Sequence, residues 1–122
     1  MPLVLQRFAV WGKSPDYVIP VMNARPFLMI MGDIVIGWKL LEAAGIAQER
    51  LAALYREAGA DADAAKAAAL TRENPEVAFY QGKIASATYF AAAVLPTVAG
   101  RCACIKLADK TPVEMAEESY ST

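Results

Sequence analysis

The stretch from Asn74 to Leu107 constrains the fold most, because it has the pattern of one long helix. Asn74 can cap a helix, Pro75 suits the first helical position, and Glu76 is favourable near the positive end of the helix dipole. Apolar residues then recur at steps of three or four, which places them on one face. They are Val77, Tyr80, Ile84, Ala87, Ala91, Val94, Val98, Cys102 and Ile105.

One residue interrupts this pattern. Pro96 has no backbone donor and crowds the carbonyl group of Ala92, so we expect a bend of the helix at this point. No side chain in the stretch has the character of a catalyst. The pattern by itself therefore predicts a helical module and leaves its function open.

A second long helix is predicted over about residues 15–44. Ser14, Pro15 and Asp16 form a start signal, and Gly45 is typical of a helix end. The apolar positions form a stripe with a flanking line, so we expect this helix to pack on more than one side. The stripe is Tyr17, Val21, Ala24, Leu28, Met31, Val35 and Trp38, and the flanking line is Phe27, Ile30, Ile34 and Leu41.

Two prolines complicate the first half of this helix. Pro20 and Pro26 each remove a backbone donor, so the helix either kinks there or begins near Asn23. Gly32 and Gly37 lower helix propensity but allow another helix to come close.

The other segments are shorter. Residues 1–12 predict a short leading helix, residues 46–73 an Ala-rich connection with a break near Gly59, and residues 109–122 a polar tail. No segment alternates with the period of two that marks a strand. The sequence therefore predicts a single all-α domain over residues 1–122, a small antiparallel helical bundle built on two long helices, about 15–44 and 75–107.

Composition indicates a partner. Hydrophobic residues make up 57% of the 122 residues, which is high for a small domain and leaves apolar surface to be covered by another copy, another domain or a membrane. We expect no membrane span, because the run from Phe27 to Trp38 falls short of ~20 residues and is cut by Asp33. With a net charge of −1 and 12 scattered basic residues, we expect no nucleic acid partner. The N-terminus has no signal-peptide core, which favours a cytoplasmic protein.

Side chains suited to chemistry are few. The absence of His excludes a His-dependent triad or His-ligated metal. Cys102 and Cys104 point to different sides of a helix and are interpreted as small interface residues. Asp61 and Asp63 are too sparse for a calcium loop. We assign no catalytic, cofactor-binding or metal residue.

Asp33 is the acidic residue inside the apolar run of the second helix. One hypothesis is a carboxylate whose properties are tuned by burial. The other is an Asp on the polar seam of the helix, and we prefer it because burial of an unpaired charge is costly.

Two segments resemble a recurring region of certain bacterial acyl-CoA dehydrogenases. The first, FYQGKIASATYFAAAVLP, is similar to an aromatic residue, Lys-Ile-Ala-Ser-Ala, an aromatic pair and Leu-Pro near the C-terminus of those enzymes. It uses Tyr80, Lys83, Ile84, Ala85, Ser86, Ala87, Tyr89, Phe90, Leu95 and Pro96. The second, residues 23–38, looks like an upstream helix of the same region. Together the matches cover most of residues 15–108.

The resemblance implies an accessory helical domain of an FAD-dependent enzyme that oxidises acyl-CoA thioesters. The FAD-binding core and its catalytic glutamate do not match anything in these 122 residues. We therefore assign no catalytic role to the glutamates of the chain, and FAD is implied only for the parent enzyme. The glutamates considered are Glu42, Glu49, Glu57, Glu73 and Glu76.

Three functions compete at this point. The leading hypothesis is a non-catalytic structural and assembly domain, which packs on a dehydrogenase core or self-associates. The second is an accessory acyl-CoA-binding region, with cations near phosphates and tyrosines along an acyl channel. Its candidate residues are Lys83, Arg25, Arg101, Tyr80 and Tyr89. The third is a free-standing helical adaptor for an unrelated protein.

Overall fold

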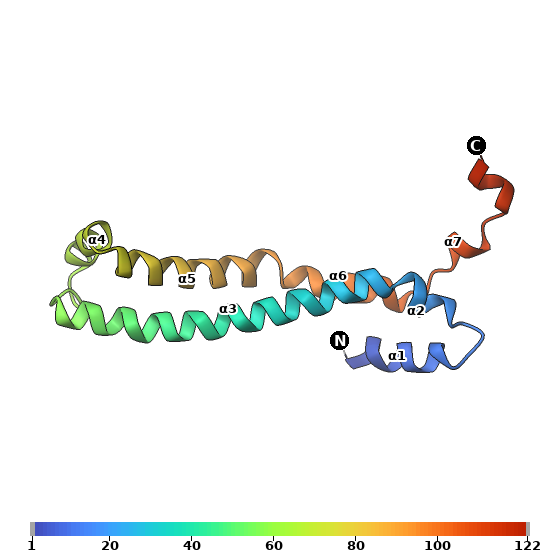
Figure 1. Ribbon diagram of the computed structural model, residues 1–122, viewed down its shortest axis with the longest axis horizontal. Helices are drawn as coiled ribbons and strands as arrows, with labels where there is room; N and C mark the ends of the chain where they lie inside the picture. Colours follow the sequence, from blue (N-terminus) through green and yellow to red (C-terminus); the bar gives the residue numbers. More distant parts are fainter. Residues whose placement is uncertain (1, 122) are drawn as a thin grey trace. The chain divides into compact units, whose positions relative to one another are not determined.

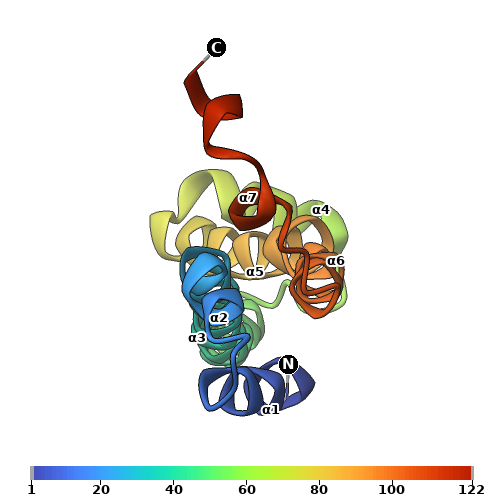
Figure 2. The ribbon, with the colours of Figure 1, turned by 90° about the vertical axis from the view of Figure 1, so that its right-hand side faces the viewer.

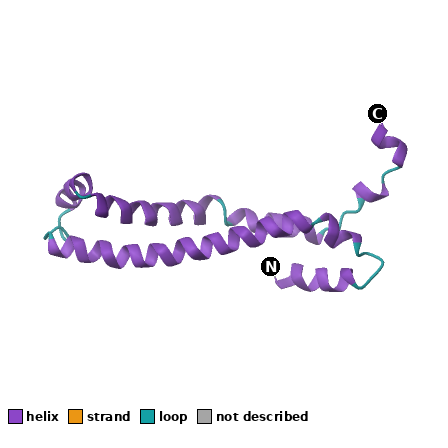
Figure 3. Ribbon diagram, viewed as in Figure 1, coloured by secondary structure: helices purple, strands orange, loops and turns teal. Residues whose placement is uncertain are grey.

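The computed structural model describes residues 2–121, with side chains from Leu3 onward, and every regular element in that range is a helix (Figures 1 and 3). The α-helices are α1 (Pro2–Gly12), α2 (Val18–Met22), α3 (Ala24–Glu57), α4 (Ala64–Glu73), α5 (Pro75–Ala93), α6 (Pro96–Lys106) and α7 (Thr111–Glu114). A 3₁₀ helix, η1, follows at Glu117–Ser121. The all-α class and the helical bundle with long helices are confirmed.

The chain divides into two compact units. The first unit comprises residues 2–32 and 97–121, and the second unit comprises residues 33–96. Helix α3 starts in the first unit and continues into the second, where α5 runs antiparallel beside it (Figure 1).

The predicted helix over 15–44 differs from the structure at both ends. The region before Asn23 forms the short helix α2, and α3 begins at Ala24, as the alternative start near Asn23 predicted. Asn23 ends α2, where its side-chain amide donates to the carbonyl of Ile19 at 2.9 Å. Pro26 then lies in the first turn of α3, where a missing donor has no cost.

The prediction that this helix ends at Gly45 was wrong. Helix α3 continues through it to Glu57, because the apolar residues Leu51, Leu54 and Tyr55 maintain an inner face beyond the glycine. The helix ends before Gly59, whose φ of 66° is the left-handed conformation that glycine adopts readily. The break predicted near Gly59 is therefore the true end of α3.

The segment 46–73 is more regular than an Ala-rich connection. Its first part belongs to α3, and residues 64–73 form α4. The start of α4 is fixed by the Asp63 carboxylate, which accepts from the amides of Ala65 at 3.0 Å and Lys66 at 3.2 Å. This capping role of Asp63 was absent from the sequence interpretation, although Asp is a preferred N-cap residue.

The helix predicted over 75–107 is two helices. Asn74 caps α5 as predicted, since its side-chain oxygen accepts from the amide of Glu76 at 2.9 Å. Helix α5 ends at Ala93, and Pro96 is the first residue of α6. A proline at the first helical position gives up no hydrogen bond, so the chain starts a new helix there rather than bending a continuous one.

The core of the first unit joins three helices. Val4 of α1, Ile30 of α3, and Cys102 and Ile105 of α6 are buried together, and partly buried side chains pack around them. These surrounding residues are Phe8, Trp11, Phe27 and Val98. Figure 2 shows the helices of this unit from a second direction, with α1, α2, α6 and α7 labelled.

A second contact in the first unit joins distant parts of the sequence. The ammonium group of Lys110 donates to the carboxylate of Asp16, 94 residues away in the chain. The hydrogen bond to Asp16 raises the pKa of Lys110 above its ordinary value of 10.5. This ion pair holds the segment after α6 to the loop between α1 and α2.

Two glycines of α3 are expected to respond differently to alanine. A Cβ at Gly45 meets nothing within 4 Å, so Gly45→Ala should stabilise the helix by about 0.5–1 kcal/mol. A Cβ at Gly37 would lie 3.0 Å from Cδ2 of Leu95 and 3.3 Å from Cε1 of Phe90, which opposes the same gain. Thermal unfolding should show a higher Tm for Gly45→Ala than for Gly37→Ala. Equal gains for both variants would contradict this close approach.

Candidate functional site

The second unit carries an apolar groove between α3 and α5. Its volume is about 610 Å³, within the range of about 300–1,000 Å³ seen for small-molecule sites. The lining residues are Gly37, Leu41, Ala44, Gln48, Ile84, Ala87, Thr88, Phe90, Ala91, Ala92 and Leu95. None of them is charged or titrates near neutral pH, so the groove offers apolar contact and no acid–base chemistry.

A polar cluster joins three helices of the second unit. The side-chain amide of Gln81 on α5 donates to the hydroxyl of Tyr55 on α3 at 2.6 Å and to that of Thr71 on α4 at 2.9 Å. Thr71 in turn donates to the carbonyl of Ala67 at 2.9 Å. The sequence interpretation missed this cluster, although Gln81 lies four residues after Val77, at the spacing of the inner face.

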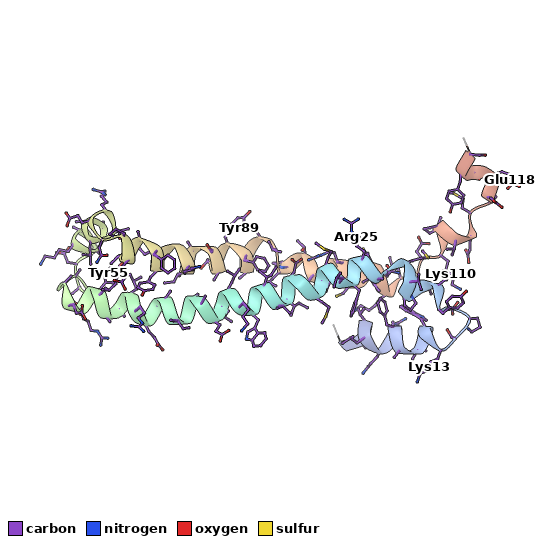
Figure 4. All side chains as sticks on the ribbon, in the orientation of Figure 1. Lys13, Arg25, Tyr55, Tyr89, Lys110 and Glu118 are labelled. Atoms are coloured by element: carbon purple, nitrogen blue, oxygen red, sulfur yellow. The ribbon has the colours of Figure 1, made fainter. Side chains whose placement is uncertain are left out.

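The two tyrosines considered for an acyl channel do not line the groove. Tyr80 donates to the Glu76 carboxylate at 3.0 Å within α5, and this hydrogen bond raises the pKa of Tyr80. Tyr89 is 71% exposed and points away from α3 (Figure 4). Both side chains are therefore surface groups of α5.

The three cations considered for phosphate binding come from both units. Lys83, in the second unit, lies over the ring of Phe79 at 5.1 Å from its centroid. Arg25, at the start of α3 in the first unit, is exposed to solvent (Figure 4). Arg101, on α6 in the first unit, donates to the hydroxyl of Thr97 at 3.1 Å. None of the three lines the groove.

The remaining candidates are Asp33 and the two cysteines. Asp33 is half-buried at the start of the second unit. Cys102 is buried in the core of the first unit, and Cys104 is exposed on the same helix. In the described range 2–121, no group of three or more Cys, Asp and Glu side chains is placed to hold a metal ion.

Apolar side chains remain exposed along α3. Sequence periodicity predicted a helix packed on more than one side, but its stripe faces solvent, with Leu28 69%, Val35 48% and Trp38 62% exposed. The flanking line contains the buried residue Ile30. The chain therefore folds with one apolar face of α3 left uncovered.

One helical stretch, Pro75–Glu114, is long and apolar enough to cross a membrane by length and composition alone. This criterion is also met by core helices of soluble proteins, so a single such stretch is weak evidence. Here the stretch is divided, because α5 ends at Ala93 and α6 begins at Pro96. Only 11% of the most apolar 18 residues of this stretch is buried within the chain. The stretch therefore adds to the uncovered apolar surface. The run from Phe27 to Trp38 does not meet the criterion in the part of the chain that is described.

Known proteins resemble this chain over most of its length. The family described as acetyl-CoA dehydrogenase C-terminal like matches residues 4–116. FadE5 of Mycobacterium tuberculosis (strain ATCC 25618 / H37Rv), a broad-specificity linear acyl-CoA dehydrogenase, is 35% identical over 94 residues. That alignment covers 77% of this chain and 13% of the relative, and no solved structure is a significant match. The chain therefore belongs to the family of acetyl-CoA dehydrogenase C-terminal-like domains.

Proposed function

We propose that this chain is a non-catalytic structural and assembly domain of an acyl-CoA dehydrogenase. In this role it packs against the rest of the enzyme, which binds FAD and oxidises acyl-CoA thioesters by α,β-dehydrogenation in the cytoplasm. The observation that carries the proposal is the uncovered apolar surface, above all the stripe on α3 that includes Leu28, Val35 and Trp38. Exposed apolar surface of this extent is typical of protein interfaces.

The arrangement of the polar side chains supports a structural role. Tyr80 is hydrogen-bonded within its own helix, and Lys83 lies over a neighbouring aromatic ring. The groove contains no cation that would meet a CoA phosphate. These contacts favour the assembly domain over an accessory acyl-CoA-binding region.

A chimaera tests the assembly role. In the mycobacterial relative, the region that aligns with this chain would be deleted or replaced by the corresponding residues of this chain. We expect the deletion to abolish the native oligomer or lower its Tm, and the replacement to restore both. A replacement that behaves like the deletion would contradict the proposal, as would a deletion without effect.

Calorimetry separates the assembly domain from the acyl-CoA-binding alternative. The chain would be titrated with butyryl-CoA and with palmitoyl-CoA, each below its critical micelle concentration. We expect no saturable heat for either thioester. Saturable binding that is lost in Lys83→Ala would instead favour a direct role in binding the substrate.

A further inference from the structure

We infer that residues 34–38 of α3 become interior when this chain is assembled with the rest of its enzyme, and that they are covered there from more than one side. The inference rests on the proposed function, which names the rest of the enzyme as the partner. It adds which part of α3 is enclosed, that a single docking face does not suffice, and which part of the second unit stays in water.

The first observation is the direction of four consecutive positions in α3. Successive residues of an α-helix point about 100° apart, so Ile34, Val35 and Ile36 face three different sides of the helix. Their exposed fractions are 36%, 48% and 48%. The fourth direction belongs to Gly37, where a Cβ would lie 3.0 Å from Cδ2 of Leu95. The chain therefore packs against one side of this turn and leaves apolar side chains on the other three.

The second observation is the pair of charged residues that bound this turn. A helix that is apolar all round is typical of the interior of a large protein or of a membrane. Asp33 directly precedes the apolar residues 34–38 and Lys39 directly follows them, whereas a membrane-spanning helix needs ~20 predominantly apolar residues in succession. Lys39 also donates to the Glu42 carboxylate at 2.8 Å on the exposed surface of α3. A short apolar turn between charges fits the interior of a protein and does not fit the core of a bilayer.

The third observation is the distribution of charge in the second unit. Residues 34–48 and 77–95 carry the charged side chains Lys39, Glu42 and Lys83. Residues 49–76, called the charged segment below, carry Glu49, Arg50, Arg56, Glu57, Asp61, Asp63, Lys66, Arg72, Glu73 and Glu76. Between Ile46 and Phe79, a range that the structure describes completely, no large hydrophobic side chain is exposed. Since the core of an interface is depleted of charged residues, the charged segment has the surface of a part that stays in water.

The kind of partner follows from the number of sides to be covered. Cover on several sides calls for several elements of a folded protein, as around a helix in the interior of a bundle. The alignment with the mycobacterial dehydrogenase covers 13% of that enzyme, so most of such an enzyme lies outside the region that this chain represents. We expect its surfaces against residues 34–36 to be apolar and uncharged, because an unpaired buried charge is costly.

Two lysine substitutions probe separate sides of the turn. Val35 and Ile36 point about 100° apart, and each is 48% exposed in the chain alone, so a lysine at either position can remain in water there. Ala52→Lys is the matched control, at an exposed position of the same helix within the charged segment. Val35→Ile and Ile36→Val are the conservative variants, which keep both positions apolar.

The variants would be made both in the chain alone and in the chimaera with the mycobacterial relative. In the chain alone, thermal unfolding followed by circular dichroism should give the parent Tm for all three lysine variants. In the chimaera, Val35→Lys and Ile36→Lys should each lower the yield of native oligomer by about tenfold or more, because each buries an unpaired charge. Ala52→Lys and the two conservative variants should keep the yield of the unsubstituted chimaera.

Several results would overturn the inference. If either Val35→Lys or Ile36→Lys leaves the oligomer of the chimaera intact, that side of the turn is not covered. An equal loss for Ala52→Lys would show that the charged segment is covered too, and an equal loss of Tm in the chain alone would place the effect within this chain.

Other occupants give different results. A chain that binds phosphatidylcholine vesicles through Val35 and Ile36, beside a chimaera indifferent to both lysines, would assign the cover to lipid. A chain that dimerises through the same residues, beside the same indifferent chimaera, would assign it to a second copy. A chimaera that assembles normally with all three lysines overturns only this inference, whereas an unsubstituted chimaera that fails to assemble overturns the proposed function and this inference with it.

Discussion

Replacing Ile105 by Ala is expected to destabilise the first unit by about 2–5 kcal/mol, the range for removing a buried Ile side chain. Ile105 is 1% exposed and lies in the cluster with Val4, Ile30 and Cys102. The cavity left by the variant would remove contacts to α1 and α3 at once. Hydrogen exchange of the α1 amides, measured with increasing urea, should show a corresponding loss of protection.

The control for this variant is the neighbouring residue Leu107. Its side chain is 78% exposed, so Leu107→Ala should change the stability by no more than about 0.5 kcal/mol. The two substitutions remove comparable apolar volume from positions two residues apart. Equal losses would contradict the burial of Ile105, and would indicate that Leu107 has a partner of its own.

Replacing Gln81 by Leu is expected to loosen α4 from the rest of the second unit. The substitution keeps the approximate volume and removes both hydrogen bonds, leaving the hydroxyls of Tyr55 and Thr71 without their donor. The expected loss is about 1–2 kcal/mol for groups that are partly buried. Hydrogen exchange should quicken across α4 (Ala64–Glu73) more than across α5.

Two hydroxyl deletions complete the experiment. Tyr55→Phe should destabilise the chain, and its effect should not add to that of Gln81→Leu, because both remove the same hydrogen bond. Tyr80→Phe should be nearly neutral, since its exposed hydrogen bond to Glu76 stays within one helix. Additive effects of the first pair would contradict a shared hydrogen bond between Tyr55 and Gln81.

Periodicity predicted the inner face of α5 and α6 well. Val77, Cys102 and Ile105 are buried, and Ile84 and Val98 are partly buried, at the positions the sequence indicates. The pattern survives the break between the helices because α6 restarts with its apolar residues directed inward. An apolar stripe that continues across a proline therefore predicts which residues are buried, but it does not predict that the helix is continuous.

Helix ends were harder to predict because local signals compete with packing. Glycine commonly follows the last residue of a helix, which is why Gly45 was predicted to end this one. Apolar residues beyond Gly45 continue the inner face of α3, and the helix continues with them. Gly59 ends the helix instead, where its positive φ is needed. The two glycines differ in backbone conformation, since only Gly59 of the two has a positive φ, and the sequence does not reveal this difference.

The sequence did not predict that the apolar stripe of α3 is left uncovered by this chain. Periodicity identifies Val35 and Trp38 as members of an apolar face, but it does not distinguish a face covered by this chain from one covered by a partner. The resemblance of residues 79–96 to acyl-CoA dehydrogenases was more informative, and the family match over residues 4–116 confirms it. The groove and the Gln81 cluster depend on side chains from separate helices, so they required coordinates.

The division of the chain has a consequence for how this family can vary. Residues 2–32 and 97–121 belong to one unit, so the hairpin of residues 33–96 is nested within it as an insertion. The entropy of closing an inserted loop grows only slowly with its length. Whole helical turns can therefore be gained or lost toward the tip of the hairpin without altering the core around Ile105 or the ion pair between Asp16 and Lys110. Evolution can thus change the length of the second unit separately from the stability of the first.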